Sequence, residues 1–313
     1  MIGTDHRVDA AGLADVARAL VEVPAAGVDD PAWVAAARRL WEEGPASIRR
    51  EVRDFRRNSG PEGTLLITGL PLGEVPDTPS ESGSVQRAPA PPAALLMLLA
   101  HGLGDPAAFA AEKSGALVQD VVPVPGQEEM QGNSGSVELT FHTENAFHAH
   151  RPDYVMLLCL RADHEERAQL RTSSIRRALP GLGAATRAAL FEPNFVTQAP
   201  ASFGTGGRGL PHAVLSGDPA DPDICFDEIS TTASTATGRG ALAELANALR
   251  QHHIGMPLRS GQLAVVDNRI AVHGRSEFVP RYDGRDRWLQ RTFAFTDLRR
   301  SRELRAGDGT VLR

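Results

Sequence analysis

The spacing of apolar and polar residues divides the chain into a helical beginning and a longer part in which short strands prevail. Between residues 10 and 57, apolar side chains recur at helical spacing, which predicts amphipathic helices. The β-branched and aliphatic segment 64–70 predicts a strand, and the apolar segment 92–104, which ends in glycine, predicts a buried helix. From residue 115 onward, strand patterns dominate.

The later strands are short and are separated by glycine, proline and polar turns. They are predicted at 116–124, 136–144, 153–162, 168–174, 194–199, 212–217, 223–227, 261–268, 269–274 and 286–298. Helical segments are predicted at 174–181, 185–192 and 241–253. Because strands and helices do not alternate as βαβ units, we predict a β-rich α+β protein built as a sandwich or jelly roll.

Composition narrows the class of protein. The 313 residues allow one or two domains, the apolar fraction of 42% is ample for a core, and the net charge of −6 argues against a general affinity for nucleic acid. Two cysteines are too few for a disulfide framework, which favours a reducing cytoplasm. The N-terminus has no apolar signal region, and the run 88–100 is short of the roughly 20 residues of a spanning helix. We therefore expect a soluble cytoplasmic protein with no membrane partner.

The most informative motif is a His-x-Glu pair, His142 and Glu144, within a predicted strand. Alternate residues of a strand point to one face, so both side chains could converge on one cation. His273, on a late strand, is the best candidate for a third ligand. Two histidines and one carboxylate are typical of non-haem Fe(II) oxygenases, although zinc hydrolases use the same residue types. His148 and His150 lie close by and remain alternative ligands.

Two arginines follow the third ligand at a spacing that suits carboxylate binding. Arg287 begins the predicted strand 286–298, and Arg291 follows four residues later on the same face. An arginine fork binds a carboxylate through two hydrogen bonds. An oxygenase that uses 2-oxoglutarate needs one such clamp, and an amino-acid substrate needs another. We also expect the glycine-containing segment 201–212 to form a loop that closes over the substrate.

Five long blocks carry a resemblance to a known family. The chain resembles the clavaminate-synthase-like Fe(II)/2-oxoglutarate oxygenases over nearly its whole length. The similarity is strongest in SGPEGTLLITGLP (59–71), GALVQDVVPVPG (115–126), FHTENAFHAHRPDYVMLLCLRAD (141–163), VVDNRIAVHGRSEF (265–278) and PRYDGRDRWLQRTF (280–293).

The resemblance implies a fold and an activity. The fold is a double-stranded β-helix, or jelly roll, with N-terminal and inserted helices. It implies one domain over 1–313, with a helical buttress at 1–62 and the core at 63–313. The implied reaction is C3 hydroxylation of a free polar L-amino acid, above all L-asparagine, for peptide antibiotic biosynthesis. Fe(II) is the cofactor, 2-oxoglutarate and O2 are co-substrates, and succinate and CO2 are products.

The resemblance also assigns residues. It implies that iron is bound by His142, Glu144 and His273, and the distal carboxylate of 2-oxoglutarate by Arg287. The substrate is implied to contact Arg291 through its α-carboxylate, Glu112 or Gln119 through its α-amino group, and Asn133 and Asp227 through its side chain. Glutamine, ornithine, lysine, a cyclic imino acid or an amino acid delivered on a carrier protein remain alternative substrates. A zinc hydrolase and a non-catalytic β-barrel binding protein remain alternative classes.

Overall fold

The computed structural model describes residues 11–200, 203 and 209–313, and it confirms the helical beginning of the chain. The first four helices are α1 (Ala11–Val21), α2 (Pro31–Trp41), α3 (Ala46–Arg57) and α4 (Pro91–Leu103). Helix α2 begins as its sequence predicts, because the Asp30 side chain accepts a hydrogen bond from the backbone N–H of Ala32 at 2.8 Å and Pro31 occupies the first turn. Helix α4 is apolar on nearly every side and is almost completely buried.

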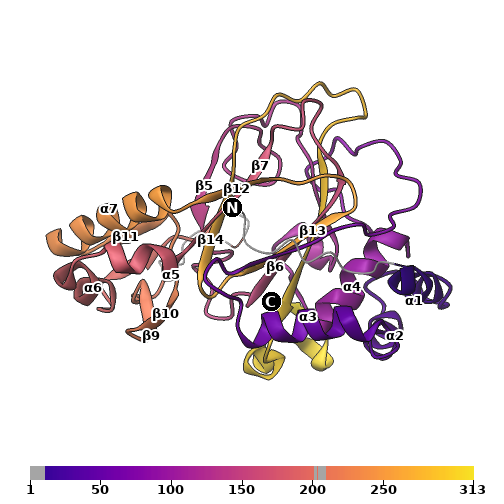
Figure 1. Ribbon diagram of the computed structural model, residues 1–313, viewed down its shortest axis with the longest axis horizontal. Helices are drawn as coiled ribbons and strands as arrows, with labels where there is room; N and C mark the ends of the chain where they lie inside the picture. The colour runs from indigo at the N-terminus through magenta and orange to yellow at the C-terminus, as the bar shows by residue number, and fades with distance from the viewer. Residues whose placement is uncertain (1–10, 201–202, 204–208) are drawn as a thin grey trace.

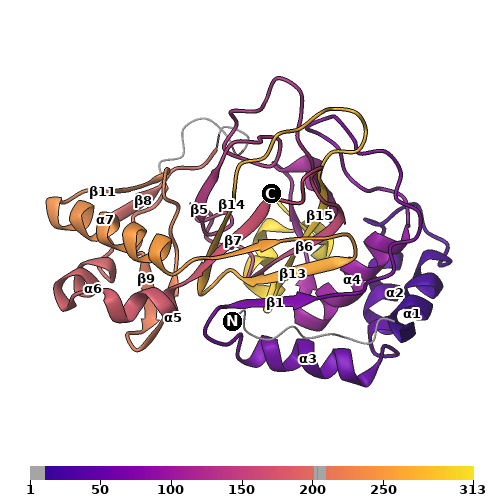
Figure 2. The same ribbon diagram turned by 45° about the horizontal axis from the view of Figure 1, so that its top comes forward.

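Two antiparallel sheets form the centre of the molecule (Figures 1 and 2). The larger sheet has the order β1 (Thr64–Ile67), β13 (Gln262–Asp267), β6 (Tyr154–Arg161), β15 (Trp288–Phe295) and β2 (Asp105–Pro106), with β4 (Gln119–Val121) also paired to β15. The smaller sheet has the order β12 (Ile254–Pro257), β7 (Gln169–Ser174), β14 (Ala271–Arg275) and β5 (Leu139–His142).

Strand β6 is buried on both faces, which explains its continuous apolar sequence. Tyr154, Met156 and Leu158 pack in the cluster that includes helices α1 to α4. Val155 and Leu157 point the other way, into a cluster that also contains side chains of the smaller sheet. The larger sheet thus lies between a helical layer and the smaller sheet.

The segment between β7 and β12 builds a separate lobe with its own apolar core, on the left in Figure 1. Its helices are α5 (Ile175–Ala178), α6 (Ala184–Leu190) and α7 (Ala236–Gln251). Its strands pair as β8 (Phe195–Thr197) with β11 (Thr231–Ala233), and β9 (Leu215–Asp218) with β10 (Asp221–Ile224). The first and last residues of the lobe connect directly to the smaller sheet.

The C-terminal segment packs back on the helical side of the molecule. Strand β16 (Val311–Leu312) pairs in parallel with β3 (Ala108–Phe109). The short 3-10 helices are η1 (Lys113–Gly115), η2 (Leu179–Gly181), η4 (Leu298–Leu304) and η5 (Ala306–Asp308). None of the described helices is long and apolar enough to cross a membrane.

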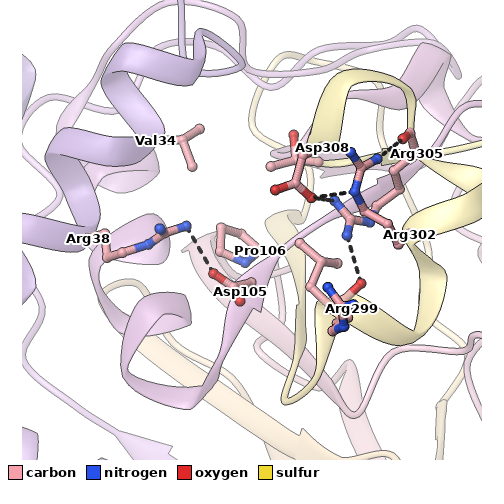
Figure 3. Close-up of a pocket in the computed structure, with 10 residues that line it drawn as sticks. Val34, Arg38, Asp105, Pro106, Arg299, Arg302, Arg305 and Asp308 are labelled. Atoms are coloured by element: carbon pink, nitrogen blue, oxygen red, sulfur yellow. Dashed lines mark hydrogen bonds and ion pairs between the residues drawn. The ribbon is translucent and has the colours of Figure 1, made fainter.

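A cleft of about 280 Å³ separates α2 from η4 and is lined by several arginines (Figure 3). Most of its charged groups form ion pairs: Arg38 with Asp105 at 3.0 Å, and Arg302 and Arg305 with Asp308 at 3.5 and 3.1 Å. None of the predicted site residues lines this cleft. We therefore interpret this cleft as part of the interface that holds the C-terminal segment against α2.

The structure confirms a mixed α+β fold with helices at the beginning of the chain. The prediction omitted the short strands β2, β3, β11, β12 and β16. The segment that it assigned to the strand 136–144 forms β5 only from Leu139 to His142. Most of the predicted loop 201–212 cannot be compared, because 201, 202 and 204–208 lie outside the described residues.

Candidate active site

Two neighbouring strands and one turn bring the predicted metal ligands together. His142 ends β5 and faces His273 of β14 across the sheet, with ring centroids 4.3 Å apart. Glu144 lies beyond the strand, in a turn where Ala146 N–H donates to the Thr143 carbonyl at 3.2 Å. Its Oε2 lies 3.3 Å from Nε2 of His273. The expectation that strand alternation aligns Glu144 with His142 is therefore wrong, yet ligand atoms of all three residues lie within 4.8 Å of one another.

Asn268 fixes the backbone of the carboxylate ligand. Its Oδ1 accepts the Glu144 N–H at 2.7 Å, and its Nδ2 donates to the carbonyls of Glu144 at 3.1 Å and Pro152 at 2.8 Å. Asn268 is completely buried in the turn between β13 and β14. It thus links Glu144 to the strand that carries His273. Sequence reasoning missed this residue, because its partners are set by tertiary contacts.

A local irregularity in the pairing of β14 with β5 shapes the histidine pair. His273 faces His142, but two residues later Arg275 faces Leu139, so β5 contains an extra residue. Gly274 lies between these positions, and a Cβ on it would lie 2.4 Å from the Leu139 carbonyl oxygen. Glycine is therefore needed here for the close approach of the two backbones.

Two of the three candidate ligands, Glu144 and His273, have pKa values shifted toward the forms that bind a divalent metal. Burial raises the pKa of Glu144, but Arg291 and the two histidines outweigh it and lower the pKa below its usual range. Burial and the neighbouring His142 lower the pKa of His273 to about 4, so its ring is neutral near pH 7. Nδ1 of His142 lies 2.9 Å from the Thr140 carbonyl, which leaves Nε2 available to a metal. An ionised carboxylate beside two imidazole rings fits a site for Fe(II).

Arg291 joins the metal ligands to the predicted substrate residues. Its Nη1 donates to Oε1 of Glu144 at 3.0 Å, its Nε donates to Oε1 of Gln119 at 3.2 Å, and its Nη2 pairs with Oε1 of Glu112. Burial lowers the pKa of Arg291, but the two facing carboxylates raise it above its usual value. Oε2 of Glu112 is buried and has no hydrogen-bond partner among the described residues. A buried ion pair with a spare acceptor thus lies beside Glu144.

These groups line a cavity of about 430 Å³. Predicted site residues on its wall are Glu112, Asn133, His142, Glu144, Asp227 and Arg291. Oδ1 of Asp227 accepts the backbone N–H groups of Ile229 at 2.9 Å and Ser230 at 2.7 Å, which fixes the carboxylate on its loop. The structure therefore brings the candidate α-amino, α-carboxylate and side-chain contacts to one cavity.

Arg287 lies apart from this wall, immediately before β15 and next to a second buried cation. The guanidinium groups of Arg287 and Arg275 lie 5.7 and 5.2 Å from the ring centroid of Phe278. Burial and Arg287 lower the pKa of Arg275 to about 9. Within the described part of the chain, Arg287 donates no hydrogen bond and Nε of Arg275 has no partner, an arrangement that favours an anionic ligand. Sequence reasoning missed Arg275, although it lies two residues after His273 on the same strand.

The other histidines near the motif do not join the triad. His148 and His150 contact each other, with His150 N–H donating to Nδ1 of His148 at 3.0 Å, and neither belongs to the cluster of ligand atoms. A second cluster consists of His164, Asp283 and Asp286. Nε2 of His164 lies 3.1 Å from Asp283, and its Nδ1 lies 3.8 Å from Asp286. His164 therefore stabilises the loop before Arg287.

Two histidines and a carboxylate with an adjacent cavity define the class of non-haem Fe(II) oxygenases. The family model for taurine catabolism dioxygenases, the TauD, TfdA family, matches residues 195–293. An L-asparagine oxygenase of Streptomyces coelicolor is 55% identical over 91% of this chain and 86% of its own length. Clavaminate synthase 2 of Streptomyces clavuligerus is 35% identical over 94% and 91%. The chain belongs to the TauD and clavaminate-synthase-like family of Fe(II)/2-oxoglutarate oxygenases.

The solved structures agree with this assignment. An asparagine oxygenase in complex with Fe(II), 2S,3S-3-hydroxyasparagine and succinate matches with a TM-score of 0.95 and 52% identity, over 98% of each chain. The protein is an Fe(II)/2-oxoglutarate-dependent amino-acid oxygenase. The zinc hydrolase and the non-catalytic binding protein are thereby disfavoured.

Proposed function

We propose that this enzyme hydroxylates free L-asparagine at C3, giving the 3-hydroxy amino acid, succinate and CO2. The observation that carries the proposal is the cavity beside the triad. Its lining includes a buried guanidinium–carboxylate pair, Arg291 and Glu112, and also Asp227, which is held on a fixed loop. Such a cavity is complementary to a zwitterionic amino acid with a polar side chain. The names of the related oxygenases support asparagine.

In this proposal, His142, Glu144 and His273 hold the iron. Fe(II), when bound with 2-oxoglutarate and O2, supplies the oxidation that turns 2-oxoglutarate into succinate and CO2 and inserts one oxygen atom into the substrate. The chain's own contribution is orientation and dry enclosure of the reacting C–H bond. Asn268 contributes by fixing the backbone of Glu144.

The zwitterionic head of the substrate is assigned to the buried ion pair. The α-carboxylate binds Arg291, and the α-ammonium group donates to Glu112, with its unpaired Oε2, or to Gln119. A thioester would offer Arg291 no charge, which argues against a carrier-bound substrate. The remaining contacts are side-chain recognition by Asn133 and Asp227, with Asp227 accepting an N–H of the carboxamide.

The second cationic site is assigned to the co-substrate. Arg287 binds the distal carboxylate of 2-oxoglutarate, and Arg275 adds a second buried positive charge. Alternation along β14 places His273 and Arg275 on one face, about 7 Å apart along the strand. This spacing suits a short dicarboxylate that reaches from the metal to the arginines.

The two main sheets are proposed to form a double-stranded β-helix, or jelly roll. The whole of 1–313 would be one oxygenase domain, with 1–62 as a helical buttress and 63–313 as the core with inserted helices. We place the enzyme in the cytoplasm and in peptide antibiotic biosynthesis, with no nucleic-acid or membrane partner.

A panel of free amino acids tests the proposal. The enzyme is incubated with Fe(II), 2-oxoglutarate and O2, and each product mass is read for a gain of one oxygen atom. We expect L-asparagine to give the highest kcat/KM, with glutamine, ornithine, lysine and proline far behind. His142→Ala should abolish turnover, and Asn247→Ala, on the exposed face of α7, should not change it. Preferred turnover of another amino acid, or of a carrier-bound one, would contradict the substrate assignment.

A further inference from the structure

The only lysine of the chain lies next to a residue of the candidate active site. Lys113 directly follows Glu112, whose carboxylate pairs with Arg291 in the lining of the cavity. Lys113 is half-buried and does not itself line the cavity. Any effect of Lys113 on the substrate must therefore pass through a neighbouring residue.

The backbone of the turn that contains Lys113 is strained. Lys113 and Ser114 have φ values of +47° and +54°, and Gly115 follows with +72°. Glycine adopts this left-handed region at little cost, but residues with a side chain do not. The Gly115 N–H donates to the Glu112 carbonyl at 2.9 Å and closes the turn. Because strained residues persist only where the surrounding structure holds them, we looked for the contacts that support this turn.

The Lys113 ammonium group ties the strained turn to the loop before α4. Its Nζ donates to the backbone carbonyls of Ser82 and Ser84, the second at 3.3 Å. Burial and the neighbouring Arg291 lower the pKa of Lys113 to about 8, so the group is still mostly protonated near pH 7. The turn is therefore held by a charged donor on two backbone acceptors, a stronger contact than one between neutral groups.

The loop that accepts these hydrogen bonds is itself fixed to β4. Oγ of Ser84 donates to Oδ2 of Asp120 at 2.6 Å, and the Ser84 carbonyl accepts the Asp120 N–H at 3.3 Å. Val85 forms an antiparallel bridge with Gln119. The Gln119 side chain in turn accepts a hydrogen bond from Nε of Arg291 at 3.2 Å. The loop and the buried ion pair are thus connected through one strand.

These contacts form a closed ring around the strained turn. Its members, in order, are Lys113, Glu112, Arg291, Gln119 and Ser84, and strand β4 links the last two. We infer that Lys113 is a positioning residue for the reaction: its ammonium group fixes the turn that directs the Glu112 carboxylate toward Arg291 and the α-ammonium group of the substrate. This role rests on the proposed function and goes beyond it, because Lys113 does not touch the substrate.

The kinetics of Lys113→Met and Lys113→Gly test this inference. Methionine keeps most of the stem without the ammonium group, and glycine removes the side chain but accepts the positive φ, so the second variant should fold even if the first does not. We expect the KM for L-asparagine to rise about 10- to 100-fold in both, with a smaller change in kcat. Fe(II) affinity and the KM for 2-oxoglutarate should stay at wild-type values. Arg239→Met, which removes an exposed cation from α7, should match the wild type.

Two further measurements show whether Lys113 acts through Glu112. Succinamate is asparagine without the α-amino group, so its Ki as a competitive inhibitor should be the same for the wild type and Lys113→Met. In a Glu112→Gln background, Lys113→Met should weaken anaerobic binding of asparagine less than about twofold. An unchanged KM for asparagine in both single variants, an equal loss for succinamate, or full additivity with Glu112→Gln would overturn the inference. A wild type that does not hydroxylate asparagine would instead overturn the proposed function.

Discussion

Replacing Asn268 by alanine would remove the three hydrogen bonds that fix the carboxylate ligand. The Glu144 N–H and the carbonyls of Glu144 and Pro152 would each lose their side-chain partner in a fully buried place. Each unsatisfied group costs about 1–3 kcal/mol, and water entering the vacated space recovers part of this. We therefore expect unfolding of the metal-free protein to require roughly 3–5 kcal/mol less free energy.

The same change should weaken metal binding, because Glu144 would no longer be held at the position that faces His273. Loss of a supporting contact of this kind typically costs about 10- to 100-fold in metal affinity. Denaturant unfolding of the metal-free protein and anaerobic Fe(II) titration measure the two effects separately. Asn268→Asp should also lower stability and Fe(II) affinity, because it places a carboxylate against two carbonyl oxygens. The control Asn247→Ala should change stability by less than about 0.5 kcal/mol. A loss below about 1 kcal/mol with unchanged Fe(II) affinity would refute the reasoning.

Three further predictions follow from the same structure. Gly274→Ala should push β5 away from β14, because the new Cβ would meet the Leu139 carbonyl at 2.4 Å; Fe(II) affinity should fall while the secondary structure seen by circular dichroism stays intact. Arg275→Leu should raise the KM for 2-oxoglutarate at least about tenfold and leave the Fe(II) affinity unchanged, and an unaltered KM would contradict its assignment. Burial lowers the pKa of His101 and His273 to about 4, below the value of about 6.5 in the unfolded chain, so the metal-free protein should lose stability as the pH falls from about 6.5 to about 4. His101→Gln should reduce this dependence of the unfolding midpoint on pH. The same pH dependence in the variant and the wild type would contradict the role assigned to His101.

Most helices and strands could be predicted from the sequence, because the pattern of apolar residues in each one matches the faces that the fold buries. Strand β6 and helix α4 are continuous apolar runs that the structure buries on every side. Strand β12 was missed because its sequence, Ile-Gly-Met-Pro, has little intrinsic strand preference and owes its conformation to pairing with β7. Local propensity could not have revealed it.

The sequence predicted the three residues of the ligand cluster but not the geometry that brings them together. His142 and His273 were each predicted to lie on a strand, and the structure pairs these two strands. Glu144 reaches the same point from a turn, and that turn depends on Asn268, which lies 124 residues away in sequence. Spacing alone carries no information on such a contact. The resemblance to known oxygenases supplied the assignment that local patterns left open.

The stoichiometry of a single reaction tests the central claim most directly. With Fe(II), 2-oxoglutarate and L-asparagine, succinate and 3-hydroxyasparagine should form in equal amounts, and both should vanish in His273→Ala. Turnover with Zn²⁺ alone, or hydroxylation without consumption of 2-oxoglutarate, would contradict the account.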